Sequence, residues 1–268
     1  MPRVERDDGV EIHWEGRGRG PAVVLVPHSF VHPSVFAPIT EELAPDHRVV
    51  RYDARGTGDS TRRGPYDMET GTADLIAVLE DVGGAASAVG LGDAINRAVR
   101  VASARPDLIH AVVGPPPIPI ESFEGTDAMA SSRTVREAML EMLNTDYRGA
   151  TRTLITAGNP QMSEDELRER MRSQIEHCPA EAATAMFHAW VADDAGRFAR
   201  EIGDRLWAIY SDRMASSWFP PAAEVSALIQ ERFPEAHAYE LEDGIVSRPD
   251  LTAAVVRQAT ASLRTARA

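Results

Sequence analysis

Buried strands alternate with amphipathic helices along the first 113 residues, and this alternation restricts the possible folds more than any other feature of the sequence. Residues 22–26 are all apolar, which is typical of a strand with both faces buried. Residues 10–15 alternate apolar with polar side chains and predict an edge strand. Further strands are predicted at 47–52, 85–90 and 108–113, separated by helices at 34–44, 69–82 and 93–105. This order of elements predicts a parallel sheet with right-handed crossovers.

Helical periodicity replaces this alternation from about residue 118 to residue 203. Three prolines at 115–117 end the first part, because a run of prolines cannot continue a β-ladder. A capping-box signature at 163–166 starts one helix of the middle part, and residues 180–190 form another amphipathic stretch. Two strands and two helices follow, at 205–211, 221–232, 237–241 and 249–263. The predicted organisation is therefore an α/β core (1–117), a helical cap (118–203) and a second part of the core (204–268).

The composition argues against nucleic acid or an anionic membrane surface as the main partner, and the ligand we expect is a hydrophobic small molecule. Acidic residues outnumber basic ones by 41 to 28, and the net charge is -13. Neither a signal peptide nor a run of about 18 apolar residues is present, so we expect a cytoplasmic protein. Cys178 is the single cysteine, and no metal-binding H-E-x-x-H spacing occurs, so we expect no metal. The segment at 56–58 lacks the third glycine of a dinucleotide fingerprint, and we expect no cofactor. The sequence neither predicts nor excludes a homodimer.

The loop after the strand at 47–52 carries the most specific motif of the chain. It reads Tyr52-Asp53-Ala54-Arg55-Gly56-Thr57-Gly58-Asp59-Ser60 and resembles the Tyr-Asp-x-Arg-Gly-x-Gly-x-Ser loop of the α/β-hydrolase superfamily. The strand and loop at 23–30 resemble the family's oxyanion-hole region, and Pro106 lies fourteen positions beyond Gly92, the family's usual spacing. The resemblance extends over nearly the whole chain. It implies an α/β-hydrolase fold, with a mostly parallel central sheet flanked by helices and an inserted helical cap.

The resemblance fails at the residues that perform hydrolysis. The family elbow G-x-S-x-G places the nucleophilic serine where this chain has Gly92. The family's catalytic histidine follows the last strand, and the aligned position here is Ile245 or Val246. A triad needs a nucleophile and a histidine that activates it. We therefore interpret the chain as a divergent member that lacks the catalytic serine and histidine.

Two alternatives remain at these positions. The triad acid aligns with Asp212 when counted from the end of its strand, and with Ser216 when counted back from the segment at 218–220. Shifting the elbow by one residue would make Asp93 a nucleophile, as in haloalkane dehalogenases and epoxide hydrolases, but the spacing to Pro106 then worsens.

The remaining pocket has its own candidate chemistry. With the family geometry, the backbone amides of Phe30 and Asp93 form an oxyanion hole, which stabilises an enolate without a nucleophile. Histidine titrates near neutral pH, so His28 and His32 are candidates for moving a proton, as is Asp93. For His28 the alternative is a structural role, since the family's histidine at this place usually hydrogen-bonds the loop backbone. The side chains expected to contact a ligand are those of Ser29, His188, Trp190, Trp218 and Asp212.

Two main interpretations of function follow. In the first, the chain is a non-hydrolytic enzyme of lyase, cyclase, dehydratase or isomerase type that acts on a hydrophobic carbonyl compound in bacterial specialised metabolism. In the second, it is an inactive pseudo-hydrolase that binds a small molecule or a protein partner. A third interpretation, an atypical hydrolase, depends on Asp93. A fold alone does not decide between them.

Overall fold

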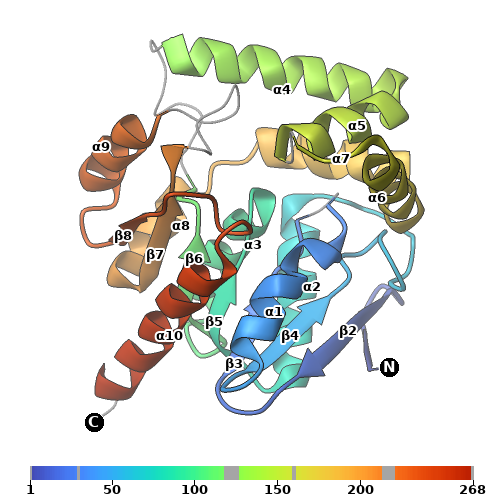
Figure 1. Cartoon of the computed structure of the whole chain (residues 1–268). Coiled ribbons are helices and arrows are strands. Elements are labelled where there is room, and N and C mark those ends of the chain that lie inside the picture. The colour runs from blue at the N-terminus through green and yellow to red at the C-terminus, as the bar shows by residue number, and fades with distance from the viewer. Residues whose placement is uncertain (1, 29–30, 118–126, 159–160, 213–220, 267–268) are drawn as a thin grey trace.

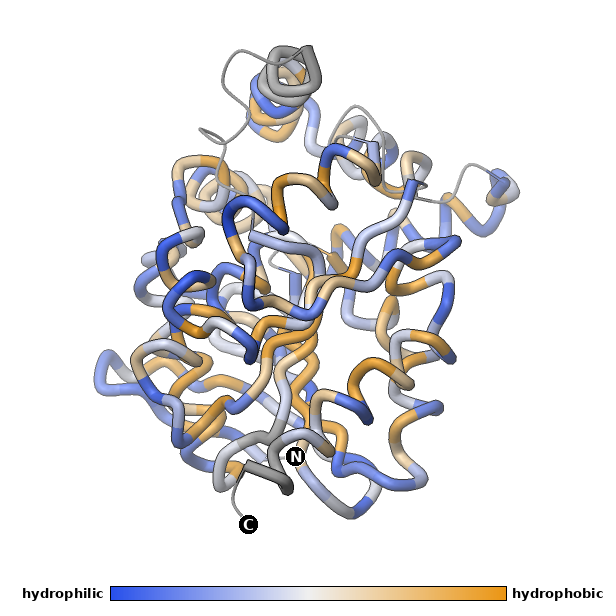
Figure 2. The backbone as a smooth tube through the Cα atoms, turned by 90° about the vertical axis from the view of Figure 1, so that its left-hand side faces the viewer, coloured by the Kyte–Doolittle hydropathy of each residue, from blue (hydrophilic) through white to orange (hydrophobic). Residues whose placement is uncertain are grey.

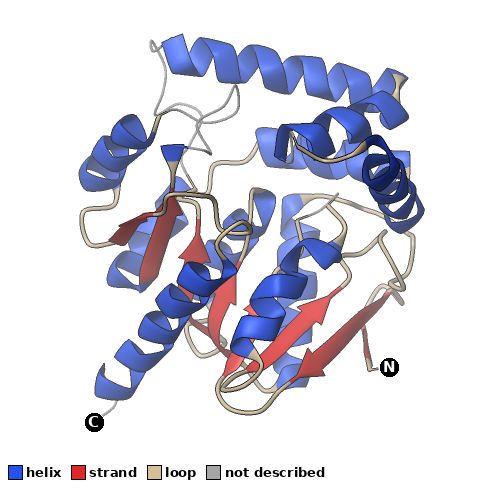
Figure 3. Ribbon diagram, viewed as in Figure 1, coloured by secondary structure: helices blue, strands red, loops and turns tan. Residues whose placement is uncertain are grey.

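An eight-stranded sheet forms the centre of the protein (Figures 1 and 3). The computed structural model describes residues 2–28, 31–117, 127–158, 161–212 and 221–266. The strands are β1 (Arg3–Glu5), β2 (Glu11–Arg17), β3 (Ala22–Leu25), β4 (Arg48–Tyr52), β5 (Ala85–Val89), β6 (Ile109–Gly114), β7 (Leu206–Tyr210) and β8 (His237–Glu240). They lie in the order β1-β2-β4-β3-β5-β6-β7-β8. The β1–β2 and β2–β4 pairs are antiparallel and the other pairs are parallel, so the mostly parallel sheet is confirmed.

Helices cover both faces of the sheet. One face carries α2 (Met68–Val82), α3 (Asp93–Ala104), α8 (Gly196–Ile202) and α9 (Ala222–Arg232). The other face carries the 3₁₀ turn η1 (Pro33–Phe36), α1 (Ala37–Leu43) and α10 (Pro249–Ala266). Strand β3 shows why both faces are needed, because Val24 packs in the first core and Val23 and Leu25 pack in the second. The strands in the middle of the molecule are mostly orange, that is hydrophobic, in Figure 2.

Four further helices form a layer over the carboxyl ends of the parallel strands (Figure 1). They are α4 (Asp127–Thr145), α5 (Tyr147–Gly158), α6 (Glu164–His177) and α7 (Ala180–Val191). Side chains of α4, α5 and α7 pack in a separate cluster around Leu143 and Phe187. Ser163 and Glu166 form the predicted capping box of α6. Helix α8 lies within the segment predicted as cap, but Ala199 and Ile202 pack in the core on the sheet.

A few elements differ from those predicted from the sequence. Strand β1 was not predicted, because its three residues are too few for a hydrophobic period to be visible. The helix predicted at 34–44 begins as a 3₁₀ turn at Pro33. Among the described residues, no helix combines the length and the apolar character that crossing a bilayer requires.

Candidate functional site

The turn between β5 and α3 places Gly92 where the sequence analysis expects the tip of an elbow. Gly92 is the N-cap of α3, with φ +52° and ψ -125°. Residues other than glycine rarely adopt this backbone conformation. Asp93 follows as the first residue of the helix, where the helix dipole stabilises its negative charge.

The imidazole of His28 lies directly over Gly92. A Cβ atom built on Gly92 would come 2.6 Å from Nε2 of His28 and 2.7 Å from its Cδ2. The ring also meets Trp190 of α7 edge to face, with 5.7 Å between the ring centroids. Trp190 packs in the same way against Phe187. His28 therefore fills the space between the elbow and the cap, which is where a side chain at position 92 would begin.

A buried ion pair holds this arrangement together. Oδ2 of Asp93 accepts a hydrogen bond from Nη2 of Arg97 (2.7 Å), and the same nitrogen donates to the carbonyl oxygen of Pro27 (2.5 Å). Nδ1 of His28 lies 3.3 Å from Oδ1 of Asp93. The side chains of Asp93 and Arg97 are only 2% and 4% exposed, respectively. Burial lowers the pKa of His28, although the charge of Asp93 acts in the opposite direction. The ring is therefore neutral near pH 7, and the ion pair fixes the 27–28 loop on the elbow.

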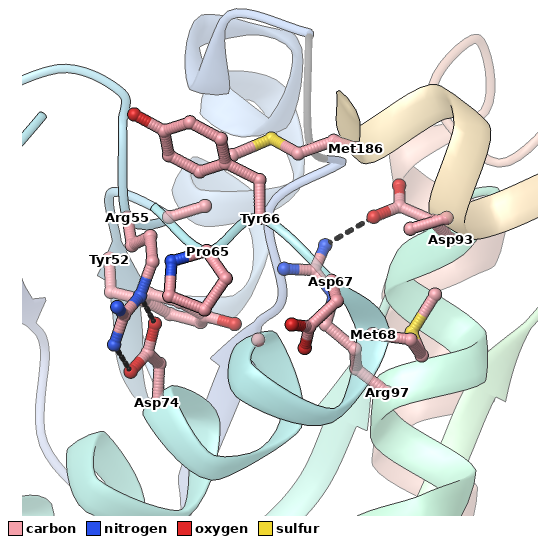
Figure 4. A pocket seen from close by; sticks show the side chains of 13 residues that line it. Tyr52, Arg55, Pro65, Tyr66, Asp67, Met68, Asp74, Asp93, Arg97 and Met186 are labelled. Atoms are coloured by element: carbon pink, nitrogen blue, oxygen red, sulfur yellow. Dashed lines mark hydrogen bonds and ion pairs between the residues drawn. The ribbon is translucent and has the colours of Figure 1, made fainter. Parts of the chain in front are cut away.

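The acid–arginine pair also borders a small void (Figure 4). Figure 4 shows the Asp93 and Arg97 side chains pointing toward one another, next to Tyr52, Tyr66 and Met186. The void measures about 20 Å³, which is room for about one water molecule. It is too small to hold a substrate.

A much larger cavity lies between the cap and the core. Its volume is about 300 Å³, at the lower end of the range for small-molecule sites. Its walls come from the segment after β3, from α5 and α6, and from the segment after β8. The apolar lining residues include Val31, Val35, Leu154, Ile155 and Val246, and the polar ones include His32, Arg170, Gln174 and Ser247. None of the described residues that line this cavity is Asp or Glu.

His32 has a defined protonation state in this cavity. The backbone N–H of Ser34 donates to Nδ1 of His32 (3.1 Å), and Oγ of Ser34 lies 2.9 Å from the same nitrogen. Burial, followed by the positive charge of Arg170, lowers the pKa of His32. The ring is therefore neutral at pH 7. Because Nδ1 accepts a hydrogen bond, Nε2 carries the proton of the ring.

Two contacts orient this histidine from the cap. Its backbone N–H donates to Oε1 of Gln174 in α6. Its ring meets that of His177 edge to face, with 4.9 Å between the ring centroids. Burial lowers the pKa of His177 to about 4, so this second ring is neutral too. His32 thus presents an N–H donor from a ring that the cap holds in place.

The other predicted site residues lie apart from this cavity, with one exception. Val246 lines the cavity, whereas Ile245 is buried in the core beneath it. His188 is exposed on α7, and Asp212 is exposed and accepts a hydrogen bond from the backbone N–H of Ala222 at the start of α9 (2.9 Å). Neither lines the cavity. Ser29, Phe30, Ser216 and Trp218 lie outside the described residues.

Three residues of the elbow and the cavity were not predicted from the sequence. Arg97 had a signal, because Asp93 and Arg97 are four residues apart on one helix and such pairs face each other. Arg170 and Gln174 had none, because the face of α6 that points into the cavity depends on how the cap sits on the core.

One group of described side chains has the composition of a metal site. His13, Asp53 and Asp59 each offer a ligand atom, and these atoms lie within 4.8 Å of one another. However, Oδ2 of Asp53 accepts a hydrogen bond from the backbone N–H of Asp59 and lies 3.0 Å from Nδ1 of His13. These contacts close the 53–60 loop, which gives the group a structural role.

Solved structures with similar architecture span nearly the whole chain. An esterase from Exiguobacterium antarcticum has a TM-score of 0.79 at 14% identity, covering 96% of this chain and 98% of its own. An enol-lactonase from Burkholderia xenovorans has a TM-score of 0.69 at 21% identity (96% and 99% covered). A bromoperoxidase from Bacillus anthracis has a TM-score of 0.74 at 18% identity (100% and 99% covered).

Similarity detected from the sequence covers a smaller part of the chain. No family model matches the chain. A polyketide synthase, ThaQ, from Burkholderia thailandensis is 34% identical over 98 residues, which is 36% of this chain and only 5% of that protein. The structural matches, together with the strand order and the helical layer over the strand ends, show that the chain has the α/β-hydrolase fold.

Proposed function

We propose that the chain is a non-hydrolytic enzyme on an α/β-hydrolase fold, of lyase, cyclase, dehydratase or isomerase type. Its substrate is a hydrophobic carbonyl compound that binds in the cavity between cap and core. The observation that carries this proposal is the cavity itself, with an apolar wall and with His32 presenting an N–H donor. The elbow supports it, because Gly92 offers no side chain and the His28 ring covers it.

His32 has the properties of an electrophile for a carbonyl group. A neutral imidazole that donates from Nε2 can hydrogen-bond a carbonyl oxygen and stabilise the negative charge that develops there in an enolate-like transition state. The fixed ring matters, because a preorganised donor is not reoriented during the reaction. The apolar walls formed by Val31, Val35 and Leu154 hold the hydrocarbon part and exclude water from it.

Hydrolysis through Asp93 is not part of the proposal. A nucleophilic carboxylate must reach the substrate, but Asp93 is buried, is bound to Arg97, and faces the water-sized void rather than the large cavity. The aliphatic side chains of Ile245 and Val246 offer no base at the position where the family histidine is expected.

Two of the comparisons support this proposal indirectly. The fold occurs in proteins described as an esterase and as a bromoperoxidase, so it does not by itself require hydrolysis. The partial match to a polyketide synthase supports a place in bacterial specialised metabolism.

A second candidate function is ligand binding without chemistry. The observation that favours it is the ion pair of Asp93 and Arg97, which holds the His28 loop closed over the elbow. In such a pseudo-hydrolase the cavity binds the same class of compound, but His32 only orients it.

Turnover of a bound compound separates the two candidates. Apolar ketones, lactones and unsaturated acids of about ten non-hydrogen atoms are first screened for binding by thermal shift, and each ligand found is then followed by mass spectrometry. We expect conversion to an isomer or an elimination product, and its loss in His32→Ala. His237→Ala is the control, because His237 lies at the start of β8, at the end of the strand away from the cap. Stoichiometric binding with no product would favour the pseudo-hydrolase, and ester hydrolysis would overturn both.

A further inference from the structure

Arg170 differs from its neighbours on helix α6. Arg168 pairs with Asp165, and Arg172 pairs with Glu169, and all four of these side chains are exposed. Arg170 lies two positions from each of these arginines, so it points to the opposite side of the helix, where it lines the cavity. Gln174, one turn further on, lines the same cavity.

Among the described residues of the cavity wall, none carries a charge opposite to that of Arg170. Within the part of the chain that the structure describes, Arg170 forms no ion pair, and no carboxylate lines the cavity. Glu166, one turn earlier on α6, is bound at the N-cap of the helix. Its Oε2 accepts hydrogen bonds from the backbone N–H (3.0 Å) and from Oγ (2.6 Å) of Ser163. The whole chain has a net charge of -13, yet this cavity presents a single positive side chain among the described residues of its wall. A guanidinium placed in a partly apolar wall favours an anionic partner.

We infer that the compound bound in this cavity is an amphipathic anion, whose carboxylate pairs with the guanidinium of Arg170 while its hydrocarbon part contacts Val31, Val35 and Leu154. This inference rests on the proposed function, because it takes the same cavity as the ligand site. A planar guanidinium matches a carboxylate through two parallel N–H donors. The hydroxyl of Ser247 offers a further donor in the same wall.

The volume sets the size of this anion. About 300 Å³ corresponds to about ten water molecules at liquid density, and so to a ligand of about ten non-hydrogen atoms. Octanoate has this size and carries a carboxylate, and octanamide has the same size without the charge. The two compounds are therefore a matched pair of probes.

Isothermal titration calorimetry of the full chain with sodium octanoate and with octanamide tests the inference. We expect octanoate to bind at least about tenfold more tightly than octanamide, since a carboxylate forms an ion pair with two parallel hydrogen bonds to the guanidinium, whereas the neutral amide offers a single carbonyl acceptor. Arg170→Met is expected to remove this preference, because it lowers the affinity for octanoate far more than the affinity for octanamide. Arg172→Met is the control and should keep the preference, because Arg172 is exposed and paired with Glu169.

The outcomes separate the inference from the proposed function. Equal affinity of the unaltered chain for both probes overturns the anion inference and leaves the cavity as a binding site for neutral carbonyl compounds. A preference for octanoate that survives in Arg170→Met and in Arg170→Gln also overturns it. Failure of both probes to bind contradicts the role of the cavity, and with it the proposed function. The comparison of the two probes needs no variant, so a misfolded variant does not prevent the test.

Discussion

Replacing Gly92 by alanine tests whether His28 closes the elbow. Two costs arise in the folded state. The backbone at φ +52° and ψ -125° strains any residue with a Cβ, at about 1 to 3 kcal/mol. The new methyl group would also lie 2.6 Å from Nε2 of His28, and such overpacking costs about 1 to 3 kcal/mol. The loss of unfolded-state entropy returns a few tenths to about 1 kcal/mol. We expect a net destabilisation centred on about 3 kcal/mol, within limits of about 1 to 5 kcal/mol.

The two costs can be separated with two further variants. Gly83→Ala measures the strain of a positive φ (+89°) without a clash, because no atom of the described residues lies within 4 Å of the position that a methyl group would take there. It should cost about 1 kcal/mol. In a His28→Ala background the clash at Gly92 disappears, so Gly92→Ala should cost at least about 1 kcal/mol less there than in the unaltered chain.

Urea denaturation followed by circular dichroism gives each free energy of unfolding, and calorimetry should show a drop in Tm of roughly 5 to 15 °C for Gly92→Ala. A cost for Gly92→Ala equal to that of Gly83→Ala would refute the reasoning, as would an identical cost in the two His28 backgrounds. Gly92→Ser should not create esterase activity, because Ile245 and Val246 offer no base where the family histidine is expected.

The remaining predictions concern the cavity and the buried charges. His32→Ala should reduce turnover of the true substrate by about a hundredfold or more while lowering Tm by only a few degrees, as measured by steady-state kinetics and calorimetry. Asp93→Asn leaves the guanidinium of Arg97 buried without its counter-charge and should cost about 3 to 5 kcal/mol in urea denaturation; a cost below about 1 kcal/mol would contradict the buried pair. Because burial lowers the pKa of His177 from 6.5 to about 4, the unfolded chain takes up a proton in this pH range and the folded chain does not. The free energy of unfolding should therefore fall as the pH falls from about 6.5 to 4, by up to about 1.4 kcal/mol per pH unit, and His177→Gln should flatten this profile. A fluorophosphonate probe should not label the chain, and covalent labelling at the elbow would contradict the proposal that the chain is not a serine hydrolase.

Much of the core could be predicted from the sequence because its signals are local. An all-apolar run such as 22–26 can be buried only with helices on both faces, and β3 lies in the middle of the sheet for that reason. The elbow at Gly92 followed from a strand, a turn and a helix that are adjacent in the sequence. The capping box at Ser163 depends on four consecutive residues, and it too was predicted correctly.

The tertiary structure alone decided what occupies the candidate site. His28 and Asp93 are 65 positions apart, and His32 and Gln174 are 142 apart, yet each pair is in contact. No periodicity in a single sequence records such contacts, since they depend on how the helical layer sits on the sheet. The sequence determined that Gly92 has no nucleophilic side chain. Only packing decided that the His28 ring covers it and that the cavity opens instead beside His32 and Arg170, because these positions are fixed by contacts between distant segments.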